Sequence, residues 1–370
     1  MFESIGIAKT SARVLLGMAA AFAAFNGARA DTIGWALADR PHFQTPYYAN
    51  ADHSYNSAGG KTLVTRLGIG YYQVDFRKLF TNGALNNVQV SAVNTRGYCE
   101  SSGWDSEGTF QAAKMWVTCF DRTGAMADTQ FSVLYQKRTD YLGSHTQGIA
   151  FLWADQPSAV SYTPEANYNF NSSSPGLFNT IQRNSTGDYS VFIPDLTGPG
   201  GNAQVSAYSS TNTPFRCKAV STQAPGISGS IVHVLCFDQT GAAADSYFSL
   251  AFALNMPFST ITGTTTQGVY AWDDKPKRTP YTPPTPWNFN SVNASDLTQV
   301  SRSSKGAYLI TIPASITGTN GFAMVTGGTG LSDSSYCNYV GAPFLIVQCY
   351  KQGGIYQDDQ FNIAFEALAP

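Results

Sequence analysis

The sequence predicts an all-β protein made of three tandem antiparallel β-sandwich repeats, Ig-like or jelly-roll-like, with a period of about 115 residues. Three observations predict this class. A hairpin motif occurs three times at that period, the six cysteines fall two to each repeat, and no stretch of ten residues combines helical periodicity with helix caps. Short apolar runs separated by turn residues are typical of antiparallel strands.

The hairpin motif begins at a Cys that ends an apolar strand, passes through a glycine-centred turn, and continues into a strand that starts at a Phe. It reads Cys-Phe-Asp-Gln-Thr-Gly-Ala-Ala-Ala-Asp-Ser-Tyr-Phe-Ser at 236–249, with related copies at 119–132 and 349–362. Two strands joined in this way form a β-hairpin. Its turn needs a glycine with positive φ, which we expect at Gly124, Gly241 and Gly354.

The other elements also follow one order in every repeat. A first strand ends at an Asp-x-Pro turn, and a Pro- and Tyr-rich connection leads to an aromatic-Asn-Ser segment. Next comes an Arg followed four positions later by Gly and six positions later by Tyr. Alternating apolar residues predict a strand from that Tyr, as in 189–193, and another strand at 87–93 and 202–208. The Cys-bearing strand and the hairpin complete about six or seven strands, as in a small β-sandwich.

These boundaries divide the chain into a leader at 1–30 and repeats at 31–142, 143–262 and 263–370, called repeat 1, repeat 2 and repeat 3 below. The connections between repeats are polar and rich in turn formers. Each repeat is long enough to bury a core by itself. A single closed barrel or a solenoid is the alternative, although solenoid repeats usually span about 20 to 45 residues.

The leader predicts a secretory signal peptide. Lys9 and Arg13 precede an apolar run at 14–25, and Ala-Arg-Ala ends the segment at Ala30. The run is too short to cross a bilayer, and a buried N-terminal helix is the alternative. We therefore expect a secreted or periplasmic protein without a membrane span.

The cysteines fit an oxidising compartment. Six cysteines allow fifteen pairings, but a repeat that folds alone closes its own pair, at roughly 3 kcal/mol per bridge. Zinc is the alternative, although no Cys-x-x-Cys spacing is present. The expected disulfides are Cys99–Cys119, Cys217–Cys236 and Cys337–Cys349.

Composition narrows the class of partner. Charged residues make up 12% of the chain and the net charge is −2, so no basic field is available to hold nucleic acid or an anionic membrane. Hydrophobic residues at 43% and aromatic residues at 13% supply enough apolar surface for a folded core, which excludes a disordered chain.

Residues 34–366 resemble a class of bacterial proteins in three features. These are Trp-Ala-Asp-Gln-Pro at 153–157, the Arg–Gly–Tyr spacing and the hairpin motif. The chain resembles uncharacterised secreted bacterial proteins with tandem disulfide-containing β repeats. Repeat 3 departs from their pattern, with Lys351 where the other repeats have Asp121 and Asp238. The resemblance implies an exported protein and carries over no activity, cofactor or site residue.

One Arg and one Asp are shared by all three repeats. A fold must be specified three times and a catalytic centre only once, so shared residues favour a structural role, here an ion pair or a backbone clamp. One polar ligand site per repeat is the alternative. We expect these pairs to lie within hydrogen-bonding reach: Arg66 with Asp128, Arg183 with Asp245, and Arg302 with Asp358.

The unshared residues offer little catalytic chemistry. Two of the four histidines lie in loops, and two occupy positions that other repeats fill with aromatic or apolar residues; they are His42, His145, His53 and His233. No motif predicts a metal or a cofactor. Glu100, Asp105 and Glu107 beside Trp104 occur in repeat 1 alone, and they are the candidates for glycoside hydrolysis, which needs a pair of carboxyl groups.

Aromatic residues in the Pro-rich connections are the candidate ligand contacts. Exposed rings flanked by Asn and Ser stack on sugars, whereas the alternative is that they cover a sheet edge. The candidates are Tyr47, Tyr48, Tyr162, Tyr281 and Trp287. The sequence thus favours a secreted, non-catalytic binding or adhesion protein that recognises glycans or another cell-surface component. A secreted hydrolase of polysaccharide or another extracellular polymer, and a structural envelope component, are the alternatives.

Overall fold

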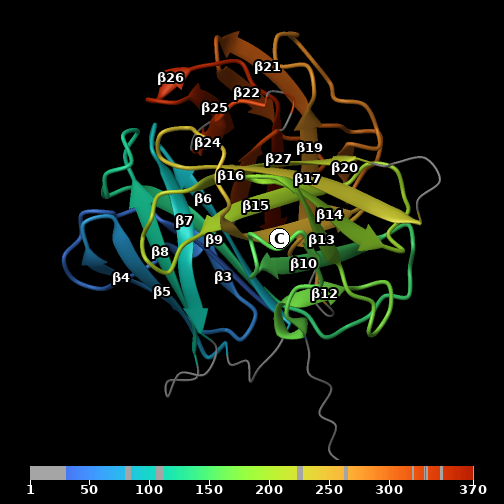
Figure 1. Ribbon diagram of the computed structural model, residues 1–370, viewed down its shortest axis with the longest axis horizontal. Helices are drawn as coiled ribbons and strands as arrows, with labels where there is room; N and C mark the ends of the chain where they lie inside the picture. Colours follow the sequence, from blue (N-terminus) through green and yellow to red (C-terminus); the bar gives the residue numbers. More distant parts are fainter. Residues whose placement is uncertain are drawn as a thin grey trace, which may run out of the picture.

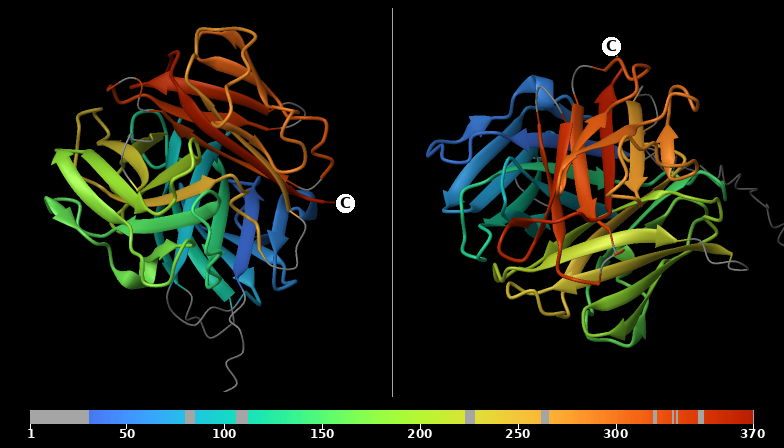
Figure 2. Two further views of the ribbon diagram at one scale, coloured as in Figure 1. Left: turned by 90° about the vertical axis from the view of Figure 1, so that its right-hand side faces the viewer. Right: turned by 90° about the horizontal axis from the view of Figure 1, so that it is seen from above.

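The computed structural model describes residues 31–79, 85–105, 112–222, 228–261, 266–318, 321–328, 330, 332–341 and 345–369, so the predicted leader lies outside it. In these ranges the protein is all-β, with strands and two short 3-10 helices. Figures 1 and 2 show three groups of strands around a common centre, with repeat 1 in blue to cyan, repeat 2 in green to yellow, and repeat 3 in orange to red. No helix in the described part is long and apolar enough to cross a bilayer.

The elements recur in one order along the chain. Repeat 1 contains β1 (Thr32–Ala38), β2 (Tyr47–Tyr48), η1 (Ala51–His53), β3 (Ser54–Asn56), β4 (Thr62–Gly68), β5 (Tyr71–Arg77), β6 (Asn86–Val93), β7 (Tyr98–Asp105), β8 (Ala112–Phe120) and β9 (Gln130–Lys137). Repeat 2 contains β10 (Gly148–Ala154), β11 (Ser161–Tyr162), η2 (Ala166–Tyr168), β12 (Asn169–Asn171), β13 (Thr180–Ser185), β14 (Asp188–Pro194), β15 (Asn202–Tyr208), β16 (Arg216–Thr222), β17 (Gly229–Phe237) and β18 (Tyr247–Leu254). Repeat 3 contains β19 (Thr266–Asp273), β20 (Asn288–Asn290), β21 (Gln299–Ser304), β22 (Ala307–Thr311), β23 (Gly321–Gly327), β24 (Tyr336–Val340), β25 (Leu345–Lys351), β26 (Ile355–Tyr356) and β27 (Phe361–Leu368).

Within each repeat these strands pair antiparallel in two groups. The inner sheet has the strand order β3-β1-β9-β6, β12-β10-β18-β15 or β20-β19-β27-β23. The outer sheet has the order β2-β4-β5-β8-β7, β11-β13-β14-β17-β16 or β21-β22-β25-β24. The same pairing therefore recurs three times, in step with the sequence repeat.

A hydrophobic cluster lies between the two sheets of each repeat. In repeat 2, Val191 and Val234 of the outer sheet belong to one cluster with Leu152 and Leu250 of the inner sheet. These residues stand on alternate positions of their strands, and burying each such side chain contributes roughly 1.5–3 kcal/mol.

The predicted disulfides are confirmed. Each joins directly opposed residues of the last two strands of an outer sheet, with S–S lengths of 2.06, 2.04 and 2.04 Å. The turn of the hairpin motif also has the expected backbone, since φ is +89° at Gly124, +86° at Gly241 and +70° at Gly354.

The described strands of each repeat pair antiparallel, as the sequence predicts, and two parallel strand pairs occur between repeats. The inner-sheet edge β15 of repeat 2 pairs parallel with the outer-sheet edge β7 of repeat 1, at Tyr208 and Ser101. Likewise, β6 of repeat 1 pairs parallel with β24 of repeat 3, at Val93 and Tyr339. The edge of each repeat is thus covered by its neighbour, which removes exposed backbone groups.

The repeats also share a core. Trp35, Phe151 and Tyr270, which occupy one equivalent position in the three inner sheets, belong to a single cluster of buried residues. Above it, a hydroxyl from each repeat accepts a hydrogen bond from the backbone of the next: Val325 N to Ser91 Oγ (3.0 Å), Val90 N to Ser206 Oγ (2.7 Å) and Val205 N to Thr326 Oγ1 (3.1 Å). The three repeats are therefore packed into one body around a common axis.

The buried Arg138 connects the segments that join successive repeats. The Arg138 guanidinium lies 3.0 Å from the Asp31 carboxylate and also donates to the backbone carbonyls of Phe258 and Thr260. Both charged side chains are less than a tenth exposed. The polar residues in these connections thus fix one repeat against another.

Candidate functional site

The shared Arg and Asp residues form the same clamp in every repeat. In repeat 1, Asp128 accepts from Arg66 Nε (3.0 Å) and Nη2 (2.9 Å), from Gly70 N (2.9 Å) and from Tyr72 Oη (3.0 Å). In repeats 2 and 3 the corresponding Arg–Asp contacts are 2.8 and 2.9 Å: Arg183 with Asp245, and Arg302 with Asp358.

Burial acts to raise the pKa of Asp128, but the hydrogen bonds from Arg66, Gly70 and Tyr72 outweigh it and lower that pKa to about 2. The carboxylate therefore stays charged and ties the hairpin motif to the outer sheet. The hydrogen bonds from the Arg, the Gly and the Tyr recur in all three repeats, so the clamp is explained by its structural role.

Four of the five aromatic residues of the Pro-rich connections lie along outer-sheet edges, whereas Trp287 lies beside the inner-sheet strand β19. The side chains of Tyr47 and Tyr281 are 7% and 5% exposed, whereas Tyr48 is 45% exposed. Tyr162 and Trp287 are half-buried, the first in the short edge strand β11 and the second 5.8 Å from Trp272. The five rings therefore do not form one exposed row, and Tyr48 offers the most accessible face.

The remaining sequence candidates are dispersed. The side chain of Glu100 is fully buried and accepts from Phe215 N at 3.2 Å, Asp105 ends β7, and Glu107 lies outside the described residues. The histidines are also separate: His42 lies 3.3 Å from Asp128, and His233 lies 2.7 Å from Asp188. Among the residues that the structure describes, no three His, Cys, Asp or Glu side chains gather as metal ligands.

The pseudo-threefold arrangement creates three equivalent seams, each between the inner sheet of one repeat and the outer-sheet edge of the next. We call them seam 2/1 (β15 beside β7), seam 1/3 (β6 beside β24) and seam 3/2 (β23 beside β16), naming the inner-sheet repeat first. Because the seams share one strand arrangement, a difference in how tightly two seams are packed is caused by their side chains.

Equivalent positions in the seams follow from the strand register. Leu37 pairs with Ser132, and Trp153 pairs with Ser249, the same residue of the hairpin motif. In the neighbouring strand pair of repeat 1, β6 and β9, Val93 opposes Gln130. At the equivalent positions of β15 and β18 in repeat 2, Tyr208 opposes Tyr247. His53 and Tyr168 each end the short 3-10 helix of their repeat.

Seam 2/1 is filled by aromatic rings. Ring centroids of Trp104 and Trp153 lie 5.9 Å apart, and Tyr208 lies 5.6 and 5.2 Å from them. Tyr168 and Tyr247 complete the group, mostly in edge-to-face contacts. Such contacts contribute about 0.5–1.5 kcal/mol per pair beyond area burial.

Seam 1/3 is open. At the positions where seam 2/1 carries Trp153, Tyr168, Tyr208 and Tyr247, it carries Leu37, His53, Val93 and Gln130. A cavity of about 670 Å³, called the seam groove below, lies there. This volume falls in the range of about 300–1,000 Å³ that is typical of sites for small molecules.

The two walls of the seam groove differ in chemistry. Repeat 1 contributes its polar residues, which are Asp39, Asn50, His53, Asn94 and Gln130. Repeat 3 contributes a mostly apolar wall with Ile310, Ile312, Phe322, Tyr339, Leu345 and Phe365. The groove thus presents donors and acceptors on one side and hydrocarbon on the other.

Part of the polar wall is held in place by hydrogen bonds. Gln130 Nε2 donates to the backbone carbonyl of Asp39 at 2.8 Å, and Asn94 Nδ2 donates to Gln130 Oε1 at 2.5 Å. Asn50 caps the 3-10 helix that ends at His53, accepting from Asp52 N at 3.1 Å. These contacts orient the wall before any ligand binds, which lowers the entropic cost of binding.

Sequence reasoning missed the seam groove, although one signal was present. The three repeats align His53 with Tyr168 and Trp287, so the missing ring in repeat 1 is visible in the sequence. Comparison of the chain with protein-family models, with curated proteins and with solved structures finds no match.

Proposed function

We propose that this chain is an exported, non-catalytic binding protein that recognises a saccharide in the seam groove. In this proposal the three repeats are β-sandwich modules that act as one rigid body rather than as separate binding units. The supporting observation is that seam 1/3 carries smaller residues at the positions where seam 2/1 carries rings, and has a cavity of about 670 Å³.

The two-sided lining supports a saccharide in particular. A sugar ring carries hydroxyl groups around its edge and C–H groups on its faces. The amides of Asn50, Asn94 and Gln130 bond hydroxyls as donors and acceptors, and the apolar wall packs on the C–H faces. A purely apolar ligand would cover the remaining donor and acceptor sites of these amides without bonding them, which costs free energy.

Binding without turnover fits the acidic groups present. Glycoside hydrolysis uses two carboxyl groups that flank the scissile bond. Asp39 is the one carboxylate among the described residues that line the seam groove. Glu100, a sequence candidate for this chemistry, is buried elsewhere against Phe215.

An extracellular or periplasmic location supports the same proposal. Three disulfides are typical of oxidising compartments, and the first thirty residues read as a secretory signal. The partner in this proposal is an extracellular glycan or a glycosylated cell-surface component. The net charge of −2 argues against nucleic acid.

A glycan array tests the proposal. We expect the mature protein to bind at least one glycan, and the double variant L37W/V93Y, which imports two rings of seam 2/1, to lose at least about tenfold in affinity. The control variant V160Y adds a ring at a residue 72% exposed and outside the groove lining, and it should bind like the wild type. Thermal unfolding checks that all three proteins are folded.

Three outcomes contradict the proposal. An array that stays silent at high protein concentration favours a structural envelope component. Release of reducing sugar from a bound polysaccharide indicates a hydrolase. Binding that survives in L37W/V93Y removes the seam groove as its location.

A further inference from the structure

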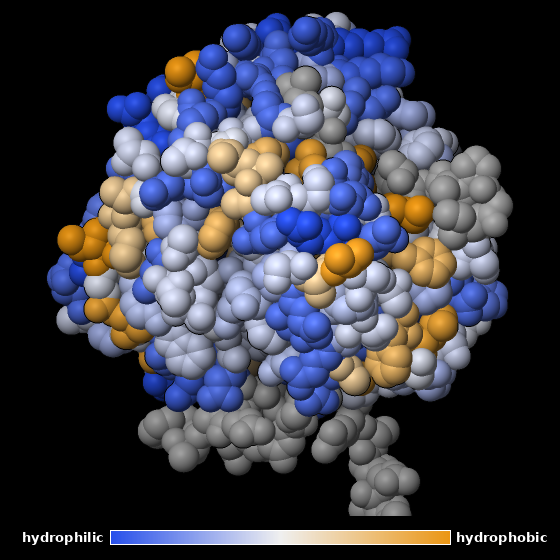
Figure 3. Space-filling view, viewed as in Figure 1, coloured by the Kyte–Doolittle hydropathy of each residue, from blue (hydrophilic) through white to orange (hydrophobic). Residues whose placement is uncertain are grey.

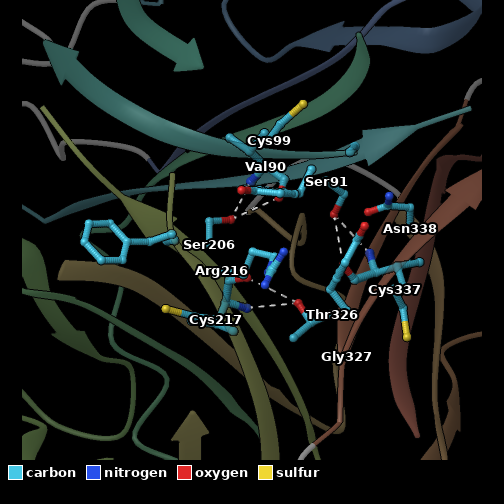
Figure 4. Close-up of a pocket in the computed structure, with 17 residues that line it drawn as sticks. Val90, Ser91, Cys99, Ser206, Arg216, Cys217, Thr326, Gly327, Cys337 and Asn338 are labelled. Atoms are coloured by element: carbon cyan, nitrogen blue, oxygen red, sulfur yellow. Dashed lines mark hydrogen bonds between the residues drawn. The ribbon is translucent and has the colours of Figure 1, made fainter. Parts of the chain in front are cut away.

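A buried arginine marks a second cavity, on the pseudo-threefold axis. Arg216 begins β16, and the equivalent first residues of β7 and β24 are Tyr98 and Tyr336. Each stands directly before a disulfide-bonded cysteine, so the three side chains meet at the axis. Figure 4 shows the three cysteines around this point, with Arg216 reaching into the middle of the ring.

The Arg216 side chain is held between two aromatic rings. Its guanidinium carbon lies 4.9 Å from the Tyr98 ring centroid and 5.0 Å from that of Tyr336. Nη2 donates to the carbonyl of Asp238 and to the side chain of Gln352. Nε and Nη1 have no hydrogen-bond partner in the described structure, although the residue is only 5% exposed.

The positive charge of Arg216 lacks a carboxylate partner within ion-pairing distance in the described chain, unlike other buried cations of this protein. Lys218, two residues later, lies 3.6 Å from Asp359 and 3.5 Å from Asp333, and Arg138 lies 3.0 Å from Asp31. A buried charge and unmet donors both cost free energy unless something pairs with them.

Nearby carboxyl groups are committed to other contacts. Asp238 accepts from the backbone N of Thr240 at 2.8 Å and from its hydroxyl at 2.7 Å. Glu100 bonds Phe215 N, and burial raises the pKa of its carboxyl group well above the usual value, which favours the neutral acid. Neither group is placed to balance the guanidinium.

The cavity beside Arg216 limits what can pair with it. Its volume is about 50 Å³, which is enough for a few water molecules or one small ion. Ser91, Ser206 and Thr326 line its other side, and their hydroxyls are already bonded to neighbouring backbone. The space therefore suits a small anion whose charge balances that of Arg216.

We propose that this axial cavity binds one monovalent halide-sized anion, such as chloride, held by Nε–H and Nη1–H of Arg216. The anion balances the charge of Arg216 at the junction of the three repeats, and so stabilises their assembly. Tyrosine at the two equivalent positions explains why the site occurs once in the molecule and not three times. This site is independent of the seam groove.

Thermal unfolding at constant ionic strength tests the site, with sodium chloride replaced stepwise by sodium gluconate. We expect the melting temperature to rise and saturate with chloride, following ligand linkage rather than salt screening. The variant R216Y restores the residue of the other two repeats, and it should unfold at one temperature in both salts. An equal melting temperature of the wild type in both salts contradicts the proposal.

Crystals grown in sodium bromide give a test that does not need a folded variant. Anomalous scattering should place one bromide within about 3.5 Å of Arg216 Nη1 or Nε. A map with no peak on the axis, or with bromide only on the surface as an adventitious ion, overturns the proposal.

Discussion

Seam 2/1 and seam 1/3 share one backbone arrangement but differ in side chains. Both join an inner-sheet edge to an outer-sheet edge through one parallel strand pair. Seam 2/1 fills the space with Trp104, Trp153 and Tyr208, whereas seam 1/3 has Leu37 and Val93 at two of these positions and has a cavity. A repeat protein can thus create a single site by making one of several equivalent junctions smaller.

The comparison also separates fold from function inside one chain. Features that occur three times, such as the Arg–Asp clamps and the disulfides, hold each repeat together. The seam groove and the cavity at Arg216 each occur where the threefold pattern is broken. On the face that Figure 3 shows, the hydrophobic residues form small separate groups.

The largest expected effect is at the filled seam. W153A removes a ring that contacts Trp104, Tyr168 and Tyr208, and we expect a loss of about 3–5 kcal/mol in the free energy of unfolding. L37A, at the equivalent position of seam 1/3, should cost less than about 2 kcal/mol because it borders a cavity. Denaturant unfolding measures both, and equal costs would remove the distinction between the seams.

The next largest effect is a pH dependence of stability in repeat 3, which supplies the apolar wall of the seam groove. Asp273 occupies the sandwich-facing position of Ala38 and Ala154, and burial raises its pKa to about 7. With the folded pKa above the ordinary value of 3.8, this group stabilises the fold at low pH, and the contribution is lost as pH rises through about 7.

D273N is neutral at every pH and keeps an oxygen for the hydrogen bond from Lys275 N, which is 3.2 Å long in the wild type. We expect the variant to be more stable than the wild type by roughly 2–4 kcal/mol at pH 8, and close to it at pH 4. Unfolding curves at the two pH values check this. A difference that is the same at both would show that titration of Asp273 is not the cause.

The smallest expected loss in the free energy of unfolding is at the Arg–Asp clamps, and it should be equal in the two repeats that form the seam groove. D128N in repeat 1 and D358N in repeat 3 remove the same clamp, and each should cost about 1 kcal/mol at pH 7 because the pairs are partly exposed. The pKa values of both carboxyl groups are lowered, so this stability is present above about pH 4 and is lost as pH falls through the folded pKa, about 2 for Asp128. Acid titration of the variants measures this, and a clearly larger cost in one repeat would mean that the clamps are not equivalent.

Much of the local structure could be predicted from the sequence. The hairpin turns, the disulfides and the Arg–Asp contacts depend on residues within one repeat, whose spacing is repeated three times. Glycine at a positive-φ position and cysteines on adjacent strands leave a direct mark on the chain.

The seams could not be predicted, because they depend on how one repeat packs on another. Aligning the Asp-x-Pro turns matches Leu37 with Trp153, as the structure does, but the sequence does not show that both residues face a neighbouring repeat. The shared core and the two parallel strand pairs are likewise contacts between residues far apart in sequence. The buried arginine on the axis stands out only once Tyr98 and Tyr336 are seen beside it.

The most direct test of the central claim is a crystal structure of the mature protein with a saccharide identified on the glycan array. We expect density for the sugar between the polar wall at Asn50 and His53 and the apolar wall at Ile312 and Leu345. Density at the exposed ring of Tyr48, or on the rings of seam 2/1 with the groove empty, would contradict it.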